Sequence, residues 1–137
     1  MSLPPQPQID PDSADFWKSL SQHQLRIQYS PAAERWQFPP LERCRFTGEA
    51  LEWRAVSPRG MIASFIVQHR PVSPGYDALL PYPIALIDLD DAPGARIPMR
   101  IAESHGDGVR VGSRVTIAFE HHPGGDFHVA VARLASV

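Results

Sequence analysis

Apolar residues recur at helical spacing only near the start of the chain. Phe16, Trp17 and Leu20 fall on one face of a helix, and Asp12 with Ser13 can cap its first turn. The pattern predicts a helix over residues 12–23. A helix this short is marginal alone, so its apolar face must dock either on its own domain or on a partner protein.

From residue 24 onward the spacing changes to the alternation typical of β-strands. Residues 25–29 alternate, and Gly124 with Gly125 favours a tight hairpin close to the end of the chain. Short strands with Gly and Pro between them, and no strand–helix alternation, favour a small antiparallel barrel. The further strand candidates are 51–56, 60–69, 82–89, 95–103, 114–121 and 127–134.

Between the helix and the barrel strands, two pairs of positions have the spacing of zinc knuckles, one pair on each side of a Phe-Pro-Pro turn. A knuckle needs two soft ligands separated by two residues. Here the first pair of positions holds Ser30 and Ala33, and the second holds Cys44 and Thr47. One thiolate with two hydroxyls and a methyl group cannot hold structural zinc, so we expect no metal and a small buried Cys44. The segment would then depend on ring packing and on contact with the barrel or a partner. The rings are Tyr29, Trp36, Phe38 and Phe46.

Taken in order, these stretches resemble the family called domain of unknown function 35. Its members carry an N-terminal helix, a rubredoxin-like zinc ribbon and an OB-fold, and are described as acyl-CoA-associated. The resemblance runs from about residue 16 to about residue 133, and departs from the family at the metal positions. Its stretches are Phe16-Trp17, 25–28, 37–40, Cys44, Glu52-Trp53, 57–60, 64–71, 81–89 and 111–115.

The resemblance implies a mainly β protein with a short helix, a degenerate, metal-free zinc-ribbon-like segment and a five- to six-stranded antiparallel OB-fold barrel. The helix would span residues 12–23, the ribbon-like segment 24–49 and the OB-fold domain 50–137. Residues 1–11 are rich in Pro and Gln and have little to bury, so we expect a disordered arm there.

The same resemblance implies a non-catalytic accessory subunit in lipid metabolism. Such a subunit binds a thiolase-like or other acyl-CoA-processing enzyme and helps to bind acyl-CoA. Contacts to the partner would come from Phe16, Trp17, Leu20, Trp36 and Phe38. Acyl-CoA would approach His69, Arg70 and Tyr82, because ligands of OB-folds usually meet the strand ends and loops at the barrel mouth.

No stretch of the sequence carries a recognisable catalytic set. Ser104, His105 and Asp107 sit within one loop, whereas triad members normally converge from distant segments. Across the final hairpin His121 would face His128, but a third metal ligand is missing. We therefore predict that the protein is not an enzyme, and that it needs no cofactor.

Composition indicates the general class of protein and its cellular compartment. The chain has 137 residues, a net charge of −2 and one cysteine, which fits a single globular unit in a reducing compartment. We expect it in the cytoplasm, since no leader or bilayer-spanning run is visible. The sequence does not determine the oligomeric state, and a homo-oligomer is one of the alternatives.

Two alternatives to the accessory subunit remain. An OB-fold with exposed aromatic rings can bind single-stranded nucleic acid, but that class needs a positive groove, and the basic residues here are scattered among acidic ones. The other alternative is a stand-alone barrel that binds acyl-CoA or another small molecule.

Overall fold

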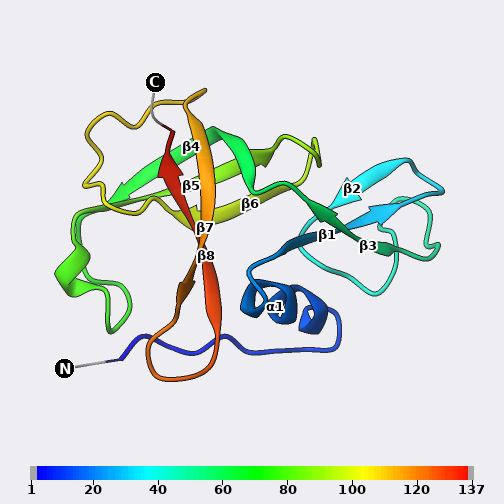
Figure 1. Cartoon of the computed structure of the whole chain (residues 1–137), viewed down its shortest axis with the longest axis horizontal. Helices are drawn as coiled ribbons and strands as arrows, with labels where there is room; N and C mark the ends of the chain where they lie inside the picture. The colour runs from blue at the N-terminus through cyan, green and yellow to red at the C-terminus, as the bar shows by residue number, and fades with distance from the viewer. Residues whose placement is uncertain (1–2, 136–137) are drawn as a thin grey trace.

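The computed structural model describes residues 3–135, which form one α-helix and two β-sheets (Figure 1). A three-stranded sheet has the order β2-β1-β3, and a five-stranded sheet has the order β6-β5-β4-β7-β8. The elements are α1 (Ala14–Ser21), β1 (Leu25–Ser30), β2 (Arg35–Gln37), β3 (Glu52–Val56), β4 (Arg59–Gln68), a short 3₁₀ helix (Asp77–Leu79), β5 (Tyr82–Leu89), β6 (Arg96–Arg100), β7 (Arg114–His121) and β8 (His128–Leu134).

The five-stranded sheet curls into a nearly closed barrel. All neighbouring strands in it are antiparallel, and a single parallel bridge from Ile101 to Ala132 brings the end of β6 against β8. Strand β5 lies between β4 and β6 and is mostly buried, as its nearly continuous apolar run predicts. Completely buried aliphatic residues such as Ile62 and Ile87 fill the interior. The fold is therefore mainly β with an OB-like barrel, as expected.

One strand pairs differently from the expectation. The segment 51–56 was assigned to the barrel domain, but β3 pairs with β1 in the small sheet, in the register Leu25↔Val56 to Tyr29↔Glu52. Apolar alternation predicts a strand without specifying its neighbour, so the sequence did not reveal this pairing. The pairing places Leu25 and Val56 in the common core beneath α1.

Helix α1 docks on its own domain, which decides between the two alternatives for its apolar face. Phe16 and Leu20 are only 6% and 1% exposed and belong to a core that joins both sheets. Burial of two such side chains stabilises the fold by roughly 3–6 kcal/mol. These two residues are not exposed for a partner, which corrects the predicted contact set. Ser13 precedes the helix without capping it, and its N–H instead donates to Asp10 Oδ1 at 2.8 Å.

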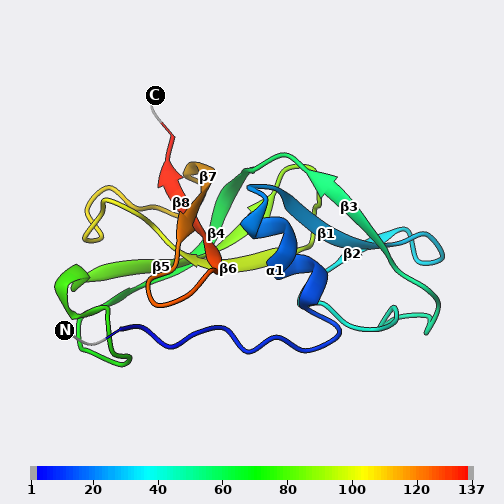
Figure 2. The same cartoon turned by 60° about the horizontal axis from the view of Figure 1, so that its bottom comes forward.

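The N-terminal arm, defined here as residues 3–10, is ordered against the barrel rather than disordered. Gln6 Nε2 donates to the carbonyl of Pro123 at 2.8 Å, and His122 Nε2 donates to the carbonyl of Pro5 at 2.8 Å. Pro4 packs so closely on Gly75 that a Cβ at this position would clash with the Pro4 backbone. Figure 2 shows the arm running beneath the barrel to α1. Met1 and Ser2, also assigned to the arm, lie outside the described residues.

Two buried glutamines hold the loop between β2 and β3. Gln28 and Gln37 face each other across β1 and β2 and are 4% and 2% exposed. The Gln28 amide donates to the carbonyl of Leu41 at 2.7 Å and accepts its N–H at 2.9 Å. The Gln37 amide donates to Arg43 O at 3.3 Å and accepts the Arg45 N–H at 3.0 Å. We call these four hydrogen bonds the amide clamp.

Rings contribute less to this loop than the sequence led us to expect. Tyr29 and Trp36 stack edge to face at 4.9 Å on the small sheet, and Phe38 packs 5.4 Å from Phe16. Phe46, however, is 48% exposed, with Arg35 and Arg45 above its ring. The buried contacts that fix the loop backbone are therefore those of the amide clamp.

Over residues 3–135, no helix has the length and apolar character needed to cross a membrane.

Replacing Gln37 by Met should destabilise the protein, because the side chain keeps its size and loses both hydrogen bonds. Each buried backbone group left unpaired costs about 1–3 kcal/mol. We expect a loss of about 2–4 kcal/mol in the free energy of unfolding, measured in urea. The matched control is Gln24→Met at an exposed position, which should change stability by less than about 0.5 kcal/mol. Equal effects of the two substitutions would contradict the clamp.

Candidate functional site

A cavity of about 560 Å³ lies between α1, the N-terminal arm and one side of the barrel. Its walls come from α1, from the loop between β4 and β5, and from strands β5, β6, β7 and β8. Most of the lining is apolar, and the volume falls in the usual range for small-molecule sites. It is the strongest candidate for a functional site in the described part of the chain.

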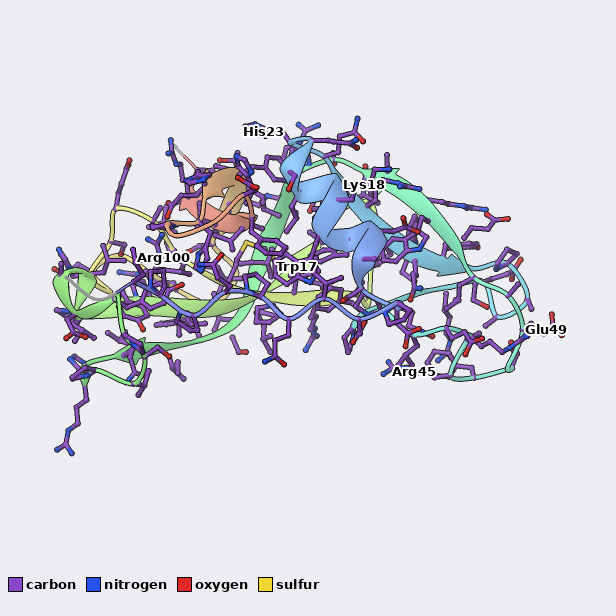
Figure 3. All side chains as sticks on the ribbon, turned by 90° about the horizontal axis from the view of Figure 1, so that it is seen from below. Trp17, Lys18, His23, Arg45, Glu49 and Arg100 are labelled. Carbon is purple, nitrogen blue, oxygen red and sulfur yellow. The ribbon has the colours of Figure 1, made fainter. Side chains whose placement is uncertain are left out.

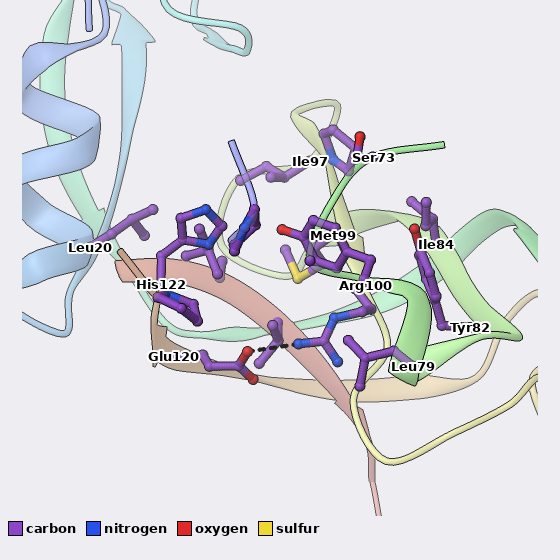
Figure 4. A pocket seen from close by; sticks show the side chains of 18 of the residues that line it. Leu20, Ser73, Leu79, Tyr82, Ile84, Ile97, Met99, Arg100, Glu120 and His122 are labelled. Carbon is purple, nitrogen blue, oxygen red and sulfur yellow. Dashed lines mark hydrogen bonds and ion pairs between the residues drawn. The ribbon is translucent and has the colours of Figure 1, made fainter. Parts of the chain in front are cut away.

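An ion pair lies on one wall of the cavity. Arg100 Nη2 donates to Glu120 Oε1 at 2.8 Å, and the two side chains are 16% and 47% exposed. Arg100 extends from β6 and Glu120 from β7, on strands that are not neighbours in the sheet. Figure 4 shows the pair between Leu20 on one side and Tyr82 on the other.

Two tyrosines stand close to this pair. Tyr76 comes from the loop after β4 and Tyr82 from the start of β5, with their ring centroids 6.0 Å apart. Burial raises the pKa of the Tyr76 hydroxyl, while the nearby Arg100 opposes that shift. Tyr76 therefore stays neutral at physiological pH and can donate a hydrogen bond.

The predicted ligand residues separate in the structure. Tyr82 is 6% exposed and lines the cavity. His69 and Arg70 are exposed just beyond the end of β4, and neither lines the cavity. The sequence placed all three together because they flank one loop, but the loop turns the first two outward.

The predicted partner contacts also divide. Phe16, Trp17, Leu20 and Phe38 line the cavity, whereas Trp36 stands on the small sheet beside Tyr29. Trp17 is half-buried and packs edge to face on Phe127 at 6.0 Å. Figure 3 shows Trp17 on the barrel side of the helix, with Lys18 turned away from it. Partner contact remains a prediction for the half-buried Trp17, Trp36 and Phe38.

Sequence reasoning missed the polar residues of the cavity. Arg100, Glu120 and His122 come from strands and a hairpin that meet only when the barrel closes. Nothing in the spacing of these residues along the chain marks them as neighbours. The one available signal was an arginine within the alternating segment 95–103.

The four knuckle positions converge beside the small sheet. The Ala33 N–H donates to Ser30 Oγ at 3.1 Å, and the Phe46 N–H donates to Cys44 Sγ at 3.4 Å. Cys44 is 3% exposed, as expected of a small buried residue. The hydroxyls of Ser30 and Thr47 favour its thiolate and lower the pKa of Cys44 to about 7.

This donor set does not fit a structural zinc ion, which takes four Cys, His or carboxylate ligands. Three of the four positions carry hydroxyl or methyl groups. Within residues 3–135, no three His, Cys, Asp or Glu side chains gather in a way that would hold a metal. We derive no role for a metal from this segment.

The histidines of the last hairpin pair as the sequence predicts. His121 and His128 are cross-strand partners with ring centroids 5.6 Å apart, and His23 approaches His128 at 5.0 Å. His121 Nε2 bonds to the carbonyl of Gly125 at 2.8 Å, so the ring also closes the turn. Of the two glycines in this turn, only Gly124 has a positive φ, of 94°.

His105 and Ser104 of the predicted loop, and two carboxylates after β5, are engaged in structural contacts. His105 Nδ1 bonds to Pro81 O at 2.8 Å, and Ser104 Oγ accepts the Gly106 N–H at 3.1 Å. The Arg114 guanidinium forms a two-point ion pair with Asp90 and lowers the pKa of that carboxyl. Asp91 accepts the Ser57 N–H at 2.9 Å, which lowers its pKa as well. Neither carboxyl is suited to act as a general acid at neutral pH.

The barrel topology, with a small sheet and a helix attached at its N-terminal side, defines an OB-fold protein. Residues 53–120 match the family model described as "ChsH2, C-terminal OB-fold domain". Residues 53–120 thus form a ChsH2-like OB-fold domain, in agreement with the OB-fold that the resemblance implied.

Two solved structures share this fold. One, described as "Ltp2-ChsH2(DUF35) aldolase", has a TM-score of 0.83 at 24% identity and covers 96% of this chain and 100% of its own. The other is a protein of unknown function from the DUF35 family of Sulfolobus solfataricus, with a TM-score of 0.61 at 13% identity, covering 91% and 86% of the two chains. At these identities the likeness establishes the fold.

Two curated proteins are similar in sequence. A probable enoyl-CoA hydratase alpha subunit of Thermomonospora curvata is 29% identical over 118 residues, which is 85% of this chain and 35% of that protein. The 3-oxo-4,17-pregnadiene-20-carboxyl-CoA hydratase alpha subunit of Mycobacterium tuberculosis is 30% identical over 93 residues, or 62% and 27% of the two chains. The chain thus spans about a third of the length of these relatives.

Purified protein should contain far less than one zinc ion per chain, because the knuckle positions offer a single soft ligand. Inductively coupled plasma mass spectrometry before and after chelator treatment measures this directly. One zinc per chain, retained through the chelator, would contradict the prediction.

Cys44 should make the stability of the protein depend on pH. Its pKa is lowered from 9.0 to about 7 in the folded state, so between pH 7 and pH 9 the unfolded chain binds more protons there. This contribution to stability is present above pH 9 and is lost as pH falls through 7. We therefore expect the difference in unfolding free energy between wild type and Cys44→Ala to grow from pH 6 to pH 9. A constant difference in urea titrations would overturn this assignment.

Proposed function

We propose that this protein is a non-catalytic accessory subunit that binds an acyl-CoA-processing enzyme and helps to hold its acyl-CoA substrate. The observation that carries the proposal is the match of nearly the whole chain to the structure described as an Ltp2-ChsH2(DUF35) aldolase. Both curated relatives are named as alpha subunits of CoA-thioester hydratases, which supports the same class.

The contacts of the polar residues support a non-catalytic role. In the described residues, His105 and His121 bond to backbone carbonyls and Asp90 and Asp91 are held by Arg114 and the Ser57 N–H, whereas His128 Nδ1 is buried without a hydrogen-bond partner. General acid–base or nucleophilic catalysis requires such groups to converge on a substrate. The cavity instead offers apolar walls with one neutralised ion pair, which suits binding rather than chemistry.

An apolar strip beside the cavity is a suitable surface for the enzyme. Ile66, Val72 and Leu86 are 61%, 67% and 37% exposed. Ile66 pairs across the sheet with Ile84, which lines the cavity, and Val72 lines it directly. Exposed apolar side chains grouped in this way mark interaction sites more often than isolated ones do. A partner bound here would lie next to the cavity.

The kind of enzyme is the finer part of the proposal. The resemblance to the family implied a thiolase-like partner, and the names of the relatives favour an aldolase or a hydratase. All of these enzymes act on CoA thioesters, so the common expectation is a partner of that class.

Charge balance argues against the nucleic-acid alternative, since 15 acidic residues offset 13 basic ones along the chain. Arg54, Arg100 and Arg114 each bond to an acidic side chain, on Glu52, Glu120 and Asp90 respectively. A single-strand binder needs uncompensated positive charge along its groove. A stand-alone acyl-CoA carrier remains the second candidate because the cavity could serve it equally well. It differs from the proposal in needing no partner.

A tagged full chain, captured from its own host, should bring down an acyl-CoA-processing enzyme that can then be produced separately. Ile66→Asp should weaken binding to that enzyme at least about tenfold, because it places a charge in an apolar contact. Binding is measured by surface plasmon resonance. Val111→Asp is the matched control, since Val111 is 67% exposed and outside the strip, and it should bind like wild type. Thioester turnover by the chain alone, or equal binding by the two variants, would contradict the proposal.

A further inference from the structure

We propose that the cavity binds the acyl group of an acyl thioester, with the thioester carbonyl at Arg100 and the apolar tail directed toward α1. The acyl identity rests on the proposed function, and the site itself rests on the geometry of the cavity. The predicted residues His69 and Arg70 take no part in it, whereas Tyr82 does.

The apolar part of the cavity fits a hydrocarbon chain. Phe16, Trp17 and Leu20 of α1, together with Phe38, form the wall at the helix end. Ile84 and Met99 contribute further apolar surface from β5 and β6. A ligand of this character gains roughly 25 cal/mol for each Å² of apolar surface that leaves water. No charged side chain other than those of Arg100 and Glu120 lines the cavity in the described residues.

The ion pair selects a neutral oxygen over a charged one. One Arg100 N–H donates to Glu120, and a guanidinium has five donors, so further donors remain for a ligand. Glu120 already neutralises the charge of Arg100, so a carboxylate would meet a wall without net positive charge. A thioester carbonyl needs only a hydrogen-bond donor. The geometry thus favours an acyl thioester over the corresponding free acid.

The N-terminal arm forms part of the enclosure. Pro4 lines the cavity, and two hydrogen bonds, between Pro5 and His122 and between Gln6 and Pro123, tie the arm to the β7–β8 hairpin. The Gln6 bond is exposed and the His122 bond is partly buried, and neither involves α1 or the ion pair. A thioester that enters with its tail first would leave the bulky CoA part outside this enclosure.

Calorimetric titration of the full chain with decanoyl-CoA, decanoic acid and free CoA tests the inference. Decanoyl-CoA should bind at least about tenfold more tightly than either of the others, because only it supplies both the tail and a neutral carbonyl. Glu120→Gln removes the neutralising charge. It should improve binding of decanoic acid roughly tenfold, since a carboxylate then meets an unpaired guanidinium, and should change binding of decanoyl-CoA little.

A cavity-filling variant supplies the steric test. Val129 is half-buried and lines the cavity, so Val129→Phe should weaken decanoyl-CoA binding at least about tenfold. Val111→Phe makes the same change at an exposed position and should bind like wild type. Ile84→Phe fills the cavity from another strand. It replaces Val129→Phe in the test if the unfolding midpoint shows that Val129→Phe does not fold. Wild-type affinity in both folded filling variants, or equal binding of free CoA and decanoyl-CoA, would overturn the inference.

Partner binding in the same samples separates this inference from the proposed function. Folded Val129→Phe that binds the enzyme normally but loses decanoyl-CoA supports both. A chain that binds decanoyl-CoA as described, yet associates with no acyl-CoA enzyme, supports the cavity inference and overturns the proposed function alone.

Discussion

The packing of α1 between the two sheets is the contact on which the rest of the site depends. Phe16 and Leu20 join the core of the small sheet to that of the barrel, and the same helix face supplies one end of the cavity. A helix of this length has little stability of its own, so its position is set by these tertiary contacts. The cavity exists because the helix covers the barrel without filling the space beside it.

Two different sets of hydrogen bonds order the loop after β2 and the N-terminal arm. The loop after β2 is fixed by the buried amide groups of Gln28 and Gln37, whereas the N-terminal arm is bonded to the β7–β8 hairpin through Gln6 and His122. The first set satisfies backbone groups that have been removed from water, which makes it costly to disturb. The second combines an exposed bond from Gln6, which water can replace, with a partly buried bond from His122, which is only 5% exposed.

The sequence predicted the strands well and their neighbours less well. Strands β5 and β7 occupy the predicted residues because strict alternation and continuous apolar runs are local signals. The partner of β3, the docking of the arm and the meeting of Arg100 with Glu120 depend on contacts between distant residues. The resemblance to a known family predicted the OB-fold. It also pointed to Tyr82, which lines the cavity. The roles of the two glutamines were hidden because a polar residue in an alternating strand normally indicates an exposed face.

Glutamine amides carry no charge that titrates, and they are neither oxidised nor removed by chelators. The four hydrogen bonds of the amide clamp are therefore unchanged by shifts of acidity or metal supply that would alter a ribbon built on cysteines, whereas Cys44 in the same loop does titrate. The geometry around Gln28 and Gln37 thus gives this loop a set of uncharged, paired contacts that do not depend on a bound ion.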